Sequence, residues 1–574
     1  MGSTEKACFI TEYVNGAWKP VDCVLKKLYS DFVVQECAHK EGSAFPLMSN
    51  EQAQKRFEEF EHLTTADTST DPDDLIQPEA ITDVIQAELS RLTANEIKNV
   101  LIPTSGLEKD ERKAVHEYVR KFFEGALDTK TEGDNIVALS ASKKSGSNNR
   151  KRKAWPEGRP NFLHFTMAKE NKDGHFALNC IANQLRMSVT SFGVAGTKDR
   201  RAITTQRVSL YRPDAKRVHQ LNKTLRGIRV YDFAYVNEDL HLGDLSGNRF
   251  SIVLRNLKIE GLDNAQVKDY VSKRIEVWKE TGFLNYFGTQ RFGTCGTNTA
   301  EVGKQLLNKN FKKAVEILLK DRDFDDGNLI QKALQHYNRT GCAPSSLNIM
   351  KGMSAAISIE AKILRSLTKN KDDYLGAILA IPRHTRSMYV HGYQSQVFNK
   401  VLSMRFAKFG FQTVIGDVDR NENLVTNDNK PNPFNIFLPL PSADVKFPVN
   451  EIGQWYKDIL EEDGIQLSSF NDAKSHFAVG SSYRVPHVKP GNVSYKFVEN
   501  YDANEHLQPD LDNYPAIRPL DTEASPTAEI ALVINFDLPP GVYATMALRE
   551  LTRTDLGKSC QKANTTPSER SEQK

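Results

Sequence analysis

One carboxylate lies among three cations in residues 192–202. In this segment, FGVAGTKDRRA, Asp199 follows Lys198 and precedes Arg200 and Arg201. Positive neighbours favour the ionised form of a carboxyl group, and an ionised carboxylate can act as a nucleophile or a base. An exposed aspartate that is ion-paired on a basic loop gives the same pattern and is the commoner case. The residues alone leave both roles open for Asp199.

A second candidate is the phrase NYFGTQRFG at residues 285–293, which places aromatic rings, amides and an arginine between glycines. A ring such as Phe287 can stack on a base that has left its helix, and the amide of Asn285 can pair with the edge of that base. A buried aromatic turn would have the same composition. Phe32, which follows Lys26, allows two similar interpretations: a ring and a cation near a nucleotide, or ordinary strand packing beside a surface lysine.

The sequence does not contain the residues, at the required spacing, of a phosphate loop, a zinc site or a dinucleotide-binding site. Gly288 and Gly293 have the G-x-x-x-x-G spacing of a phosphate loop, but Thr294 and Cys295 follow where lysine and serine or threonine are needed. The seven cysteines contain no C-x-x-C pair and the thirteen histidines no H-E-x-x-H, so no metal site is predicted. No dinucleotide fingerprint follows a predicted strand. Cofactor-free chemistry or plain binding is therefore expected.

Length and composition indicate a soluble protein with at least two structural units. The chain has 574 residues, of which 39% are hydrophobic and 26% charged. With no secretory signal or membrane-spanning run, the protein is expected to stay inside the cell without a membrane partner. Residues 198–229 contain ten lysines and arginines against two aspartates. Such a stretch can neutralise RNA phosphates, although a solvated surface is the commoner meaning of a charge run.

The order of predicted elements favours an α+β fold. A strand is expected at residues 31–36, followed after residue 159 by strands at 162–167, 203–211, 228–236 and 249–257 and helices at 173–187, 214–225 and 264–280. Residues 301–408 have mostly helical spacing and predict a second domain. Short strands are expected at 410–510, and the run at 530–536 predicts another strand.

Residues between 55 and 158 have the pattern of an insertion. Residues 62–78 and 141–153 are rich in linker residues, and helical spacing at 79–93 and 108–125 predicts a small folded appendage between them. The cluster Lys151-Arg152-Lys153 is typical of a nuclear localisation signal, but also of a solubilising segment.

Seven phrases together resemble the TruD-type pseudouridine synthases, most closely their eukaryotic multisubstrate branch. They are SDFVVQE (30–36), HFTMAKENKD (164–173), GTKDRRAITTQ (196–206), LGDLSGNRFSIVLRN (242–256), NYFGTQRFG (285–293), MYVHGYQSQVFN (388–399) and LPPGVYATMALREL (538–551). Their joint order makes chance similarity improbable. Gly174 and Gly392 stand where the family phrases usually have threonine and alanine, and are expected to weaken their helices.

The resemblance implies a mixed-sheet pseudouridine synthase catalytic domain interrupted by a second, TruD-type α/β insertion domain. We expect the catalytic domain in three pieces, an insertion of the eukaryotic type with flexible linkers, the TruD-type insertion domain and a flexible tail. The catalytic pieces are residues 1–54, 159–300 and 511–558, the first insertion is 55–158, the second is 301–510, and the tail is 559–574.

For the site, the resemblance implies that Asp199 is the catalytic aspartate and that Lys26, Phe32, Asn285 and Phe287 line the uridine pocket. Lys27 is the alternative to Lys26, because a shift of one residue would exchange them. Arg200 or Arg201 is expected to keep Asp199 ionised or to contact a phosphate.

The implied function is isomerisation of specific uridines to pseudouridine in tRNA, and in small nuclear or messenger RNA, with an aspartate nucleophile and without cofactor or metal. The protein is expected to be a monomer in the nucleus, with the cytoplasm as a second location. The alternative is a non-catalytic RNA-binding or RNA-chaperone protein on the same fold.

Overall fold

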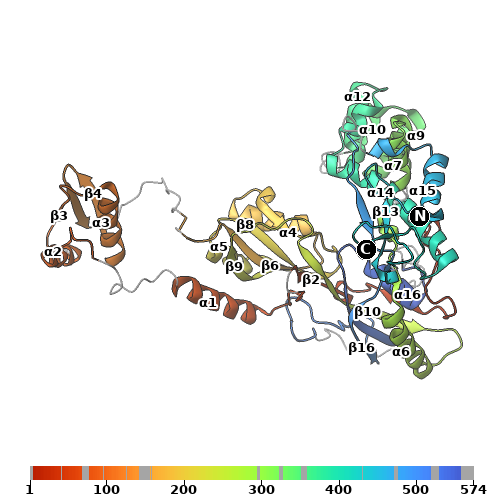
Figure 1. Cartoon of the computed structure of the whole chain (residues 1–574), viewed down its shortest axis with the longest axis horizontal. Helices are drawn as coiled ribbons and strands as arrows, with labels where there is room; N and C mark the ends of the chain where they lie inside the picture. The colour runs from red at the N-terminus through yellow and green to blue at the C-terminus, as the bar shows by residue number, and fades with distance from the viewer. Residues whose placement is uncertain are drawn as a thin grey trace.

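A nine-stranded mixed sheet forms the centre of the protein (Figure 1). The computed structural model describes residues 4–39, 42–66, 77–94, 96–123, 126–140, 155–156, 158–293, 298–321, 328–350, 358–429, 431–470, 476–518 and 529–556. The strand order is β16-β17-β10-β2-β8-β6-β9, with β1 beside β10 and β7 beside β8. The strands are β1 (Asp22–Leu25), β2 (Phe32–Ala38), β6 (Phe162–Glu170), β7 (Phe192–Val194), β8 (Ile203–Tyr211), β9 (Ile228–Val236), β10 (Leu245–Lys258), β16 (Gly491–Glu499) and β17 (Ile530–Leu538). The predicted α+β class with a mixed sheet is confirmed.

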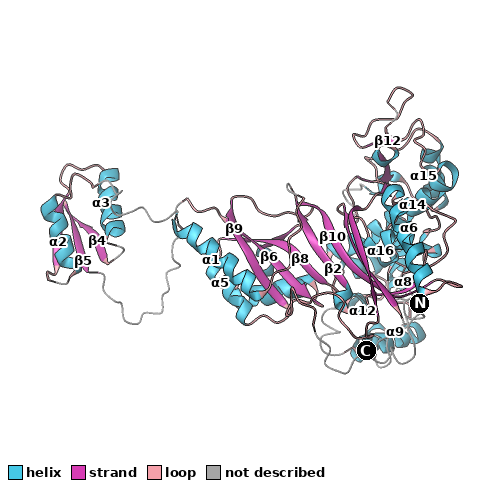
Figure 2. Ribbon diagram, turned by 90° about the horizontal axis from the view of Figure 1, so that it is seen from below, coloured by secondary structure: helices cyan, strands magenta, loops and turns pink. Residues whose placement is uncertain are grey.

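The parallel pair β2 and β8 determines where the loops of the site meet. Among the described strands of this sheet, all other neighbouring pairs are antiparallel. Val33 at the start of β2 is paired with Ile203 at the start of β8. Because both strands run in the same direction, the loops that lead into them, 26–31 and 195–202, arrive at the same edge of the sheet. Figure 2 shows β9, β6, β8, β2 and β10 side by side in this order.

Helix α6 (Asn264–Thr281) shows how the sequence builds the layer that covers the sheet. Asp263 caps it, accepting a hydrogen bond from the Gln266 N–H while the Gln266 side chain accepts from the Asp263 N–H. Val271, Ile275 and Trp278 recur at helical spacing and are buried in the main core. Two further helices, α4 (Gly174–Leu185) and α5 (Ala215–Gln220), contribute to a second core with β6, β8 and β9.

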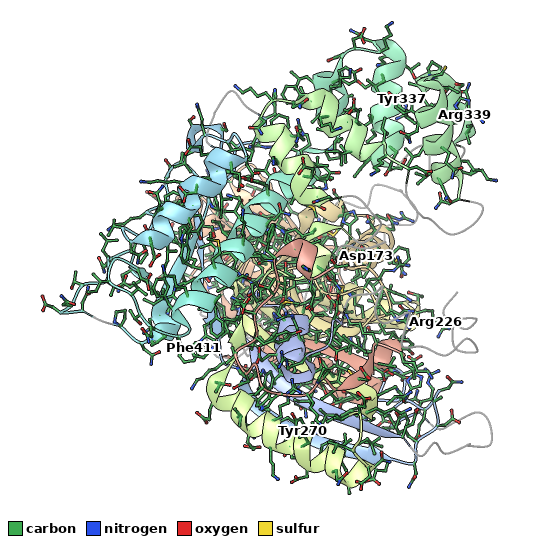
Figure 3. All side chains as sticks on the ribbon, turned by 90° about the vertical axis from the view of Figure 1, so that its right-hand side faces the viewer. Asp173, Arg226, Tyr270, Tyr337, Arg339 and Phe411 are labelled. Carbon is green, nitrogen blue, oxygen red and sulfur yellow. The ribbon has the colours of Figure 1, made fainter. Side chains whose placement is uncertain are left out.

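A mostly helical region follows residue 298, and Tyr337 in this region lies far from Tyr270 of α6 in Figure 3. Its helices are α7 (Thr299–Leu307), α8 (Phe311–Leu318), α9 (Leu329–Thr340), α10 (Ala343–Ile349), α12 (Ile359–Lys369), α13 (Tyr374–Leu379), α14 (Arg383–Phe409) and α15 (Glu451–Glu462). Short strands β12 (Val418–Asp419), β13 (Ile436–Leu440) and β14 (Ser482–Arg484) form a small sheet, and β11 (Phe283–Leu284) pairs with β15 (His487–Val488).

The two glycines that depart from the family phrases have simple structural settings. Gly392 lies where α14 crosses α7, and an added Cβ would come within 3.2 Å of Thr299 Cγ2 and 3.3 Å of the Ala300 nitrogen. Its small size therefore permits a close helix crossing. Gly174 is the first residue of α4, capped by Asp173, so it is not in the helix interior where glycine is costly.

A small α/β unit is built from residues between 77 and 140 and lies apart from the main sheet (Figure 1). Its helices α2 (Asp83–Thr93) and α3 (Lys109–Phe122) match the predicted helical spacing, and they pack on the sheet β3 (Asn99–Pro103), β5 (Asn135–Ser140) and β4 (Leu127–Glu132). The predicted linkers lie mostly outside the described residues, as do the Lys151-Arg152-Lys153 cluster and the 559–574 tail.

Two elements lie in the main fold although the expected domain ranges place them in insertions. Helix α1 (Asn50–Ala66) begins before residue 55 and buries Phe57 in the core that β6, β8 and β9 form. Strand β16 lies within the expected 301–510 domain, yet it pairs with β17 in the main sheet. The chain therefore leaves the main fold later, and returns to it earlier, than the sequence indicates. In the described part of the chain, no helix is long and apolar enough to cross a bilayer.

Candidate active site

Lys26, Phe32 and Asp199 come together at the edge where β2 and β8 begin. The Lys26 ammonium forms an ion pair with the Asp199 carboxylate and lies 3.6 Å from the centre of the Phe32 ring. The Asp199 side chain is 45% exposed and that of Lys26 19%. A cation above an aromatic ring is attracted to its electron-rich face, so Phe32 fixes Lys26 and Lys26 orients Asp199. The arrangement presents one oriented carboxylate to the solvent.

The loop that carries Lys26 is held in an unusual conformation. Lys26 has a φ of 57°, in the left-handed region that non-glycine residues rarely adopt. Asp31, at the end of this loop, is fully buried and accepts two hydrogen bonds from Arg255, at 2.9 Å from Nε and 2.6 Å from Nη2. It also accepts the Leu28 N–H at 2.9 Å. This bidentate ion pair keeps the loop in the shape that directs Lys26 toward Asp199.

Two buried lysines anchor the loop that carries Asp199. Lys198 forms a 2.5 Å ion pair with Glu36 on β2, and both side chains are at least 96% buried. Lys169, at the end of β6, is fully buried and donates to the backbone carbonyls of Asp199 at 2.7 Å and Lys172 at 2.8 Å. Three cations therefore surround Asp199, but only Lys26 reaches its carboxylate among the described residues.

Burial lowers the pKa of Lys169 to about 8, although Asp199 and Asp173 oppose the shift. At neutral pH this lysine still carries its proton, and its backbone contacts fix the main chain at Asp199.

Arg200 and Arg201, which follow Asp199, differ in their contacts. The Arg201 guanidinium donates to the Lys27 carbonyl at 2.5 Å and so joins the two loops. Arg200 is exposed, and no ion pair with it is found in the described ranges. Its contact with a phosphate stays a prediction, and no ion pair between Arg200 and the Asp199 carboxylate is found among the described residues.

Asn285 and Phe287 form a second group, organised around Arg484. The Asn285 Oδ1 accepts from Arg484 Nη2 at 2.6 Å, and its Nδ2 donates to the Val485 carbonyl at 2.8 Å. The Arg484 guanidinium lies 4.1 Å from the centre of the Phe287 ring, which is also packed edge-on against Tyr543. Burial lowers the pKa of Arg484 to about 10, so it stays charged at neutral pH.

No hydrogen bond or ring contact joins this group to Asp199 or Lys26 within the residues that the structure describes. Phe32 and Phe287 nevertheless belong to the same hydrophobic core. The structure thus brings Lys26 and Phe32 to Asp199, and places Asn285 and Phe287 on Arg484. These two bonds leave the Asn285 amide one N–H and one lone pair for a further partner. Pairing of Asn285 with a base stays a prediction.

Comparison with known proteins identifies the family. Residues 139–551 match the model of the family described as tRNA pseudouridine synthase D (TruD). The chain belongs to the TruD family. The mouse pseudouridylate synthase 7 homolog is 32% identical over 93% of this chain and 78% of its own length, and multisubstrate pseudouridine synthase 7 of Schizosaccharomyces pombe is 30% identical over 96% and 90%. The protein is therefore a pseudouridine synthase, an enzyme of the isomerase class.

A solved structure agrees with the fold. The crystal structure from Methanosarcina mazei that is described as tRNA pseudouridine synthase D (TruD) superposes with a TM-score of 0.57 and 21% sequence identity, covering 96% of this chain and 98% of that one. At this identity the likeness shows the fold alone. The match over nearly the whole chain confirms the predicted TruD fold.

The sequence did not predict a role for three residues near the site. Lys169 and Glu36 lie inside the motif phrases but had no assigned role, and Arg484 lies outside all of them. A signal exists for Lys169 and Glu36, because a charged residue within an otherwise apolar strand must be paired or hydrogen-bonded when buried. No local signal points to Arg484, since its partners are about 200 positions away. Among the described residues, no three His, Cys, Asp or Glu side chains gather as a possible metal site.

Replacing Lys26 with methionine is expected to lower kcat/KM for pseudouridine formation by about 10- to 100-fold, because Asp199 loses the contact that orients it. Lys27→Met is the comparison variant, because Lys27 is the neighbouring lysine that a shift of one residue would place in the pocket. Initial rates at low RNA concentration measure both. A larger effect at Lys27 than at Lys26 would show that the assignment is shifted by one residue.

The stability that Lys169 contributes is expected to increase with pH above about 8. Its folded pKa of about 8 lies below the ordinary value of 10.5, so between these values the unfolded chain binds more protons, which favours folding as pH rises. Urea unfolding of wild type and Lys169→Met at pH 7.5 and 9.5 tests this. From pH 7.5 to pH 9.5, the unfolding free energy of wild type should rise by about 1–3 kcal/mol relative to that of Lys169→Met. If this difference between the two proteins stays constant or falls, the prediction is wrong.

Proposed function

We propose that the protein isomerises specific uridines to pseudouridine in tRNA, and in small nuclear or messenger RNA, with Asp199 as the nucleophile and without a cofactor. The observation that carries this proposal is the exposed Asp199 carboxylate held by Lys26 above Phe32. Membership of the pseudouridine synthase family supplies the reaction class.

The reaction rearranges one nucleotide without adding or removing atoms. The bond between C1′ of the ribose and N1 of uracil breaks, the base turns, and a bond forms between C1′ and C5. The proton leaves C5 and N1 gains one, so the product is an isomer of the substrate. Asp199 can attack the sugar or the base, and in either case the carboxylate is released at the end.

Several side chains are assigned supporting roles. Lys26 orients the carboxylate, and the ring of Phe32 supports Lys26. Phe287 with Arg484 supplies an aromatic and cationic wall for the uracil, and Asn285 holds Arg484 in place. Arg200 and the exposed basic residues that follow it, up to Arg226, meet the RNA backbone, where cations release counter-ions from phosphate.

The range of substrates follows from the relatives rather than from any contact in this chain. The Schizosaccharomyces pombe relative is named as a multisubstrate synthase, which supports action on more than one class of RNA. The unit formed by residues 77–140 is a candidate for this choice, since it lies apart from the sheet that carries Asp199. Its removal should change substrate range while leaving the chemistry on a good substrate intact.

The experiment is incubation of the purified protein with transcribed tRNA and small nuclear RNA, followed by carbodiimide treatment and primer extension. The proposal expects enzyme-dependent stops at a few defined uridines without added metal or nucleotide. If wild type produces no stops on any RNA of these classes, the proposed activity is wrong.

We also propose that the enzyme is a monomer and acts in the nucleus, with the cytoplasm as a second location. The supporting feature is the Lys151-Arg152-Lys153 cluster, preceded by Lys143, Lys144 and Arg150. A fluorescent fusion should accumulate in the nucleus, and substitution of the cluster by alanines should shift it to the cytoplasm. An unchanged distribution would remove the support.

A further inference from the structure

A polar cavity of about 290 Å³ lies where β6 ends and β9 begins, away from the Lys26 and Asp199 side chains. Its walls come from four parts of the chain that are distant in sequence: the start of α1 at Asn50, the end of β6, the residues before and at the start of β9, and the segment around residue 511. The charged residues that line it are Glu170, Lys172, Arg226, Arg229 and Asp512. Several polar side chains converge on this cavity.

Hydrogen bonds connect this cavity directly to the candidate catalytic loop. The Lys169 ammonium bonds to the carbonyls of both Asp199 and Lys172, so one head group bridges the loop and the cavity wall. The Asn171 N–H donates to the Ala202 carbonyl at 3.0 Å, and the Glu170 N–H to the Gly227 carbonyl at 3.1 Å. The buried head group of Lys169 therefore joins the cavity wall to the loop that carries Asp199.

Two cations in the cavity are available to an anion. Neither Lys172 nor Arg226 forms an ion pair with any residue in the described ranges, and Arg226 is exposed (Figure 3). Arg229 is different, because it is buried and donates to the Met48 carbonyl, so it forms part of the wall. Lys172 and Arg226 thus offer the donors that a phosphate prefers.

Gly227 makes room for the Lys172 head group. Its φ is +61°, and an added Cβ would lie 2.9 Å from Lys172 Nζ and 3.2 Å from Glu170 Cγ. Any side chain here would press on both residues. The turn is therefore shaped so that the ammonium of Lys172 can rest against the backbone at the cavity wall.

Two carboxylates, Glu170 and Asp512, also line the cavity. Glu170 accepts the Leu511 N–H at 3.2 Å through one oxygen, and burial raises the pKa of this carboxyl group. Asp512 is exposed at the rim. Carboxylate oxygens accept hydrogen bonds and repel phosphate, so this side of the cavity suits a donor such as the exocyclic amino group of a base.

We propose that this cavity binds a second nucleotide of the RNA, near the target uridine, with its phosphate on Lys172 and Arg226 and its base facing Glu170 and Asp512. A base with an exocyclic amino group, adenine, guanine or cytosine, fits this lining, whereas uracil offers carbonyl oxygens to the carboxylates. The proposal rests on the proposed function and makes the cavity a determinant of which uridines are modified.

The phosphate contact is tested by measuring how tightly the protein binds a fluorescently labelled RNA that contains a target uridine, before any conversion to pseudouridine. Lys172→Ala and Arg226→Ala are each expected to weaken binding by about tenfold in moderate salt and to reduce the salt dependence by about one counter-ion. Lys55→Ala is the control, because Lys55 is an exposed lysine on α1 that does not line the cavity and has no ion pair with a described residue. Circular dichroism confirms that each variant is folded.

Base selection is tested with RNAs in which each nucleotide around the target is changed in turn to uridine. Wild type should lose at least about fivefold in kcat/KM at one flanking position, and Asp512→Asn should reduce that loss. Binding of both cavity variants equal to wild type, or an equal loss in Lys55→Ala, overturns the proposal. Because binding is measured without turnover, weakened binding together with no pseudouridine would contradict the proposed function and leave the RNA contact standing.

Discussion

Replacing Asp199 with alanine is expected to lower the rate of pseudouridine formation by about 10⁴-fold or more, the size of loss seen when a nucleophile is removed from an enzyme. In the proposed reaction no other carboxylate contacts Lys26 within the described residues, so no neighbour can replace it. Single-turnover rates with excess enzyme measure the chemical step separately from binding.

The loss should come from chemistry rather than from unfolding. The Asp199 side chain is 45% exposed, and its removal leaves the Lys198 to Glu36 pair and the Lys169 contacts in place, because those use other atoms. The melting temperature and RNA affinity of Asp199→Ala should therefore stay close to wild type. Asp199→Asn, which keeps the shape but not the charge, should be as inactive. Activity within tenfold of wild type in either variant would remove Asp199 from the mechanism.

Replacing Arg255 with methionine is expected to destabilise the fold by about 3–5 kcal/mol, because it leaves the fully buried Asp31 without its partner. Urea unfolding measures the loss. The change should also lower activity in the fraction that stays folded, since Asp31 closes the loop that carries Lys26.

Lys258→Met, on the same strand, is the matched control for Arg255. Lys258 pairs with Glu529 at the surface, where its side chain is 66% exposed, and such pairs contribute at most about 1 kcal/mol. Equal losses in the two variants would show that burial of the Asp31 pair is not the source of the effect. The double change of Arg255 and Asp31 to apolar residues should recover part of the stability.

Strong local patterns in the sequence predict much of the central sheet. Strands expected at 203–211 and 228–236 have those bounds as β8 and β9, because their branched and aromatic residues are bounded by turn residues on both sides. Helix α15 in the stretch expected to hold short strands is missed, although Asn450 caps it and Ile452, Tyr456 and Ile459 have helical spacing. The many turn residues on either side of α15 favour short strands with turns, although the apolar residues of α15 recur at helical spacing.

Strand pairing between distant segments is what local patterns cannot supply. Nothing in residues 491–499 indicates that β16 joins β17, because register depends on neighbours that the sequence does not name. Likewise α1 carries the polar composition of an insertion, and only its contact with β9 shows that Phe57 faces the second core, which β6, β8 and β9 form.

Some residues of the candidate site can likewise be predicted from the sequence, and one cannot. The family resemblance points to Asp199, Lys26 and Phe32, and the parallel start of β2 and β8 explains why Lys26 and Asp199, 173 positions apart, meet. The phrases also contain Asn285 and Phe287, but not Arg484, which donates to the Asn285 Oδ1 and lies over the Phe287 ring. Arg484 meets Asn285 and Phe287 only through the tertiary structure, so the sequence around these two residues does not indicate it.

The most direct test of the central claim is tritium release from RNA that carries tritium at C5 of its uridines. Pseudouridine formation replaces the hydrogen at C5 with the bond to C1′, so each turnover releases one label to water. Wild type should release tritium from a defined fraction of uridines, and Asp199→Ala at the same concentration should release none above background while it still binds the RNA. Equal release by the two proteins would contradict the assignment of Asp199 as the catalytic carboxylate.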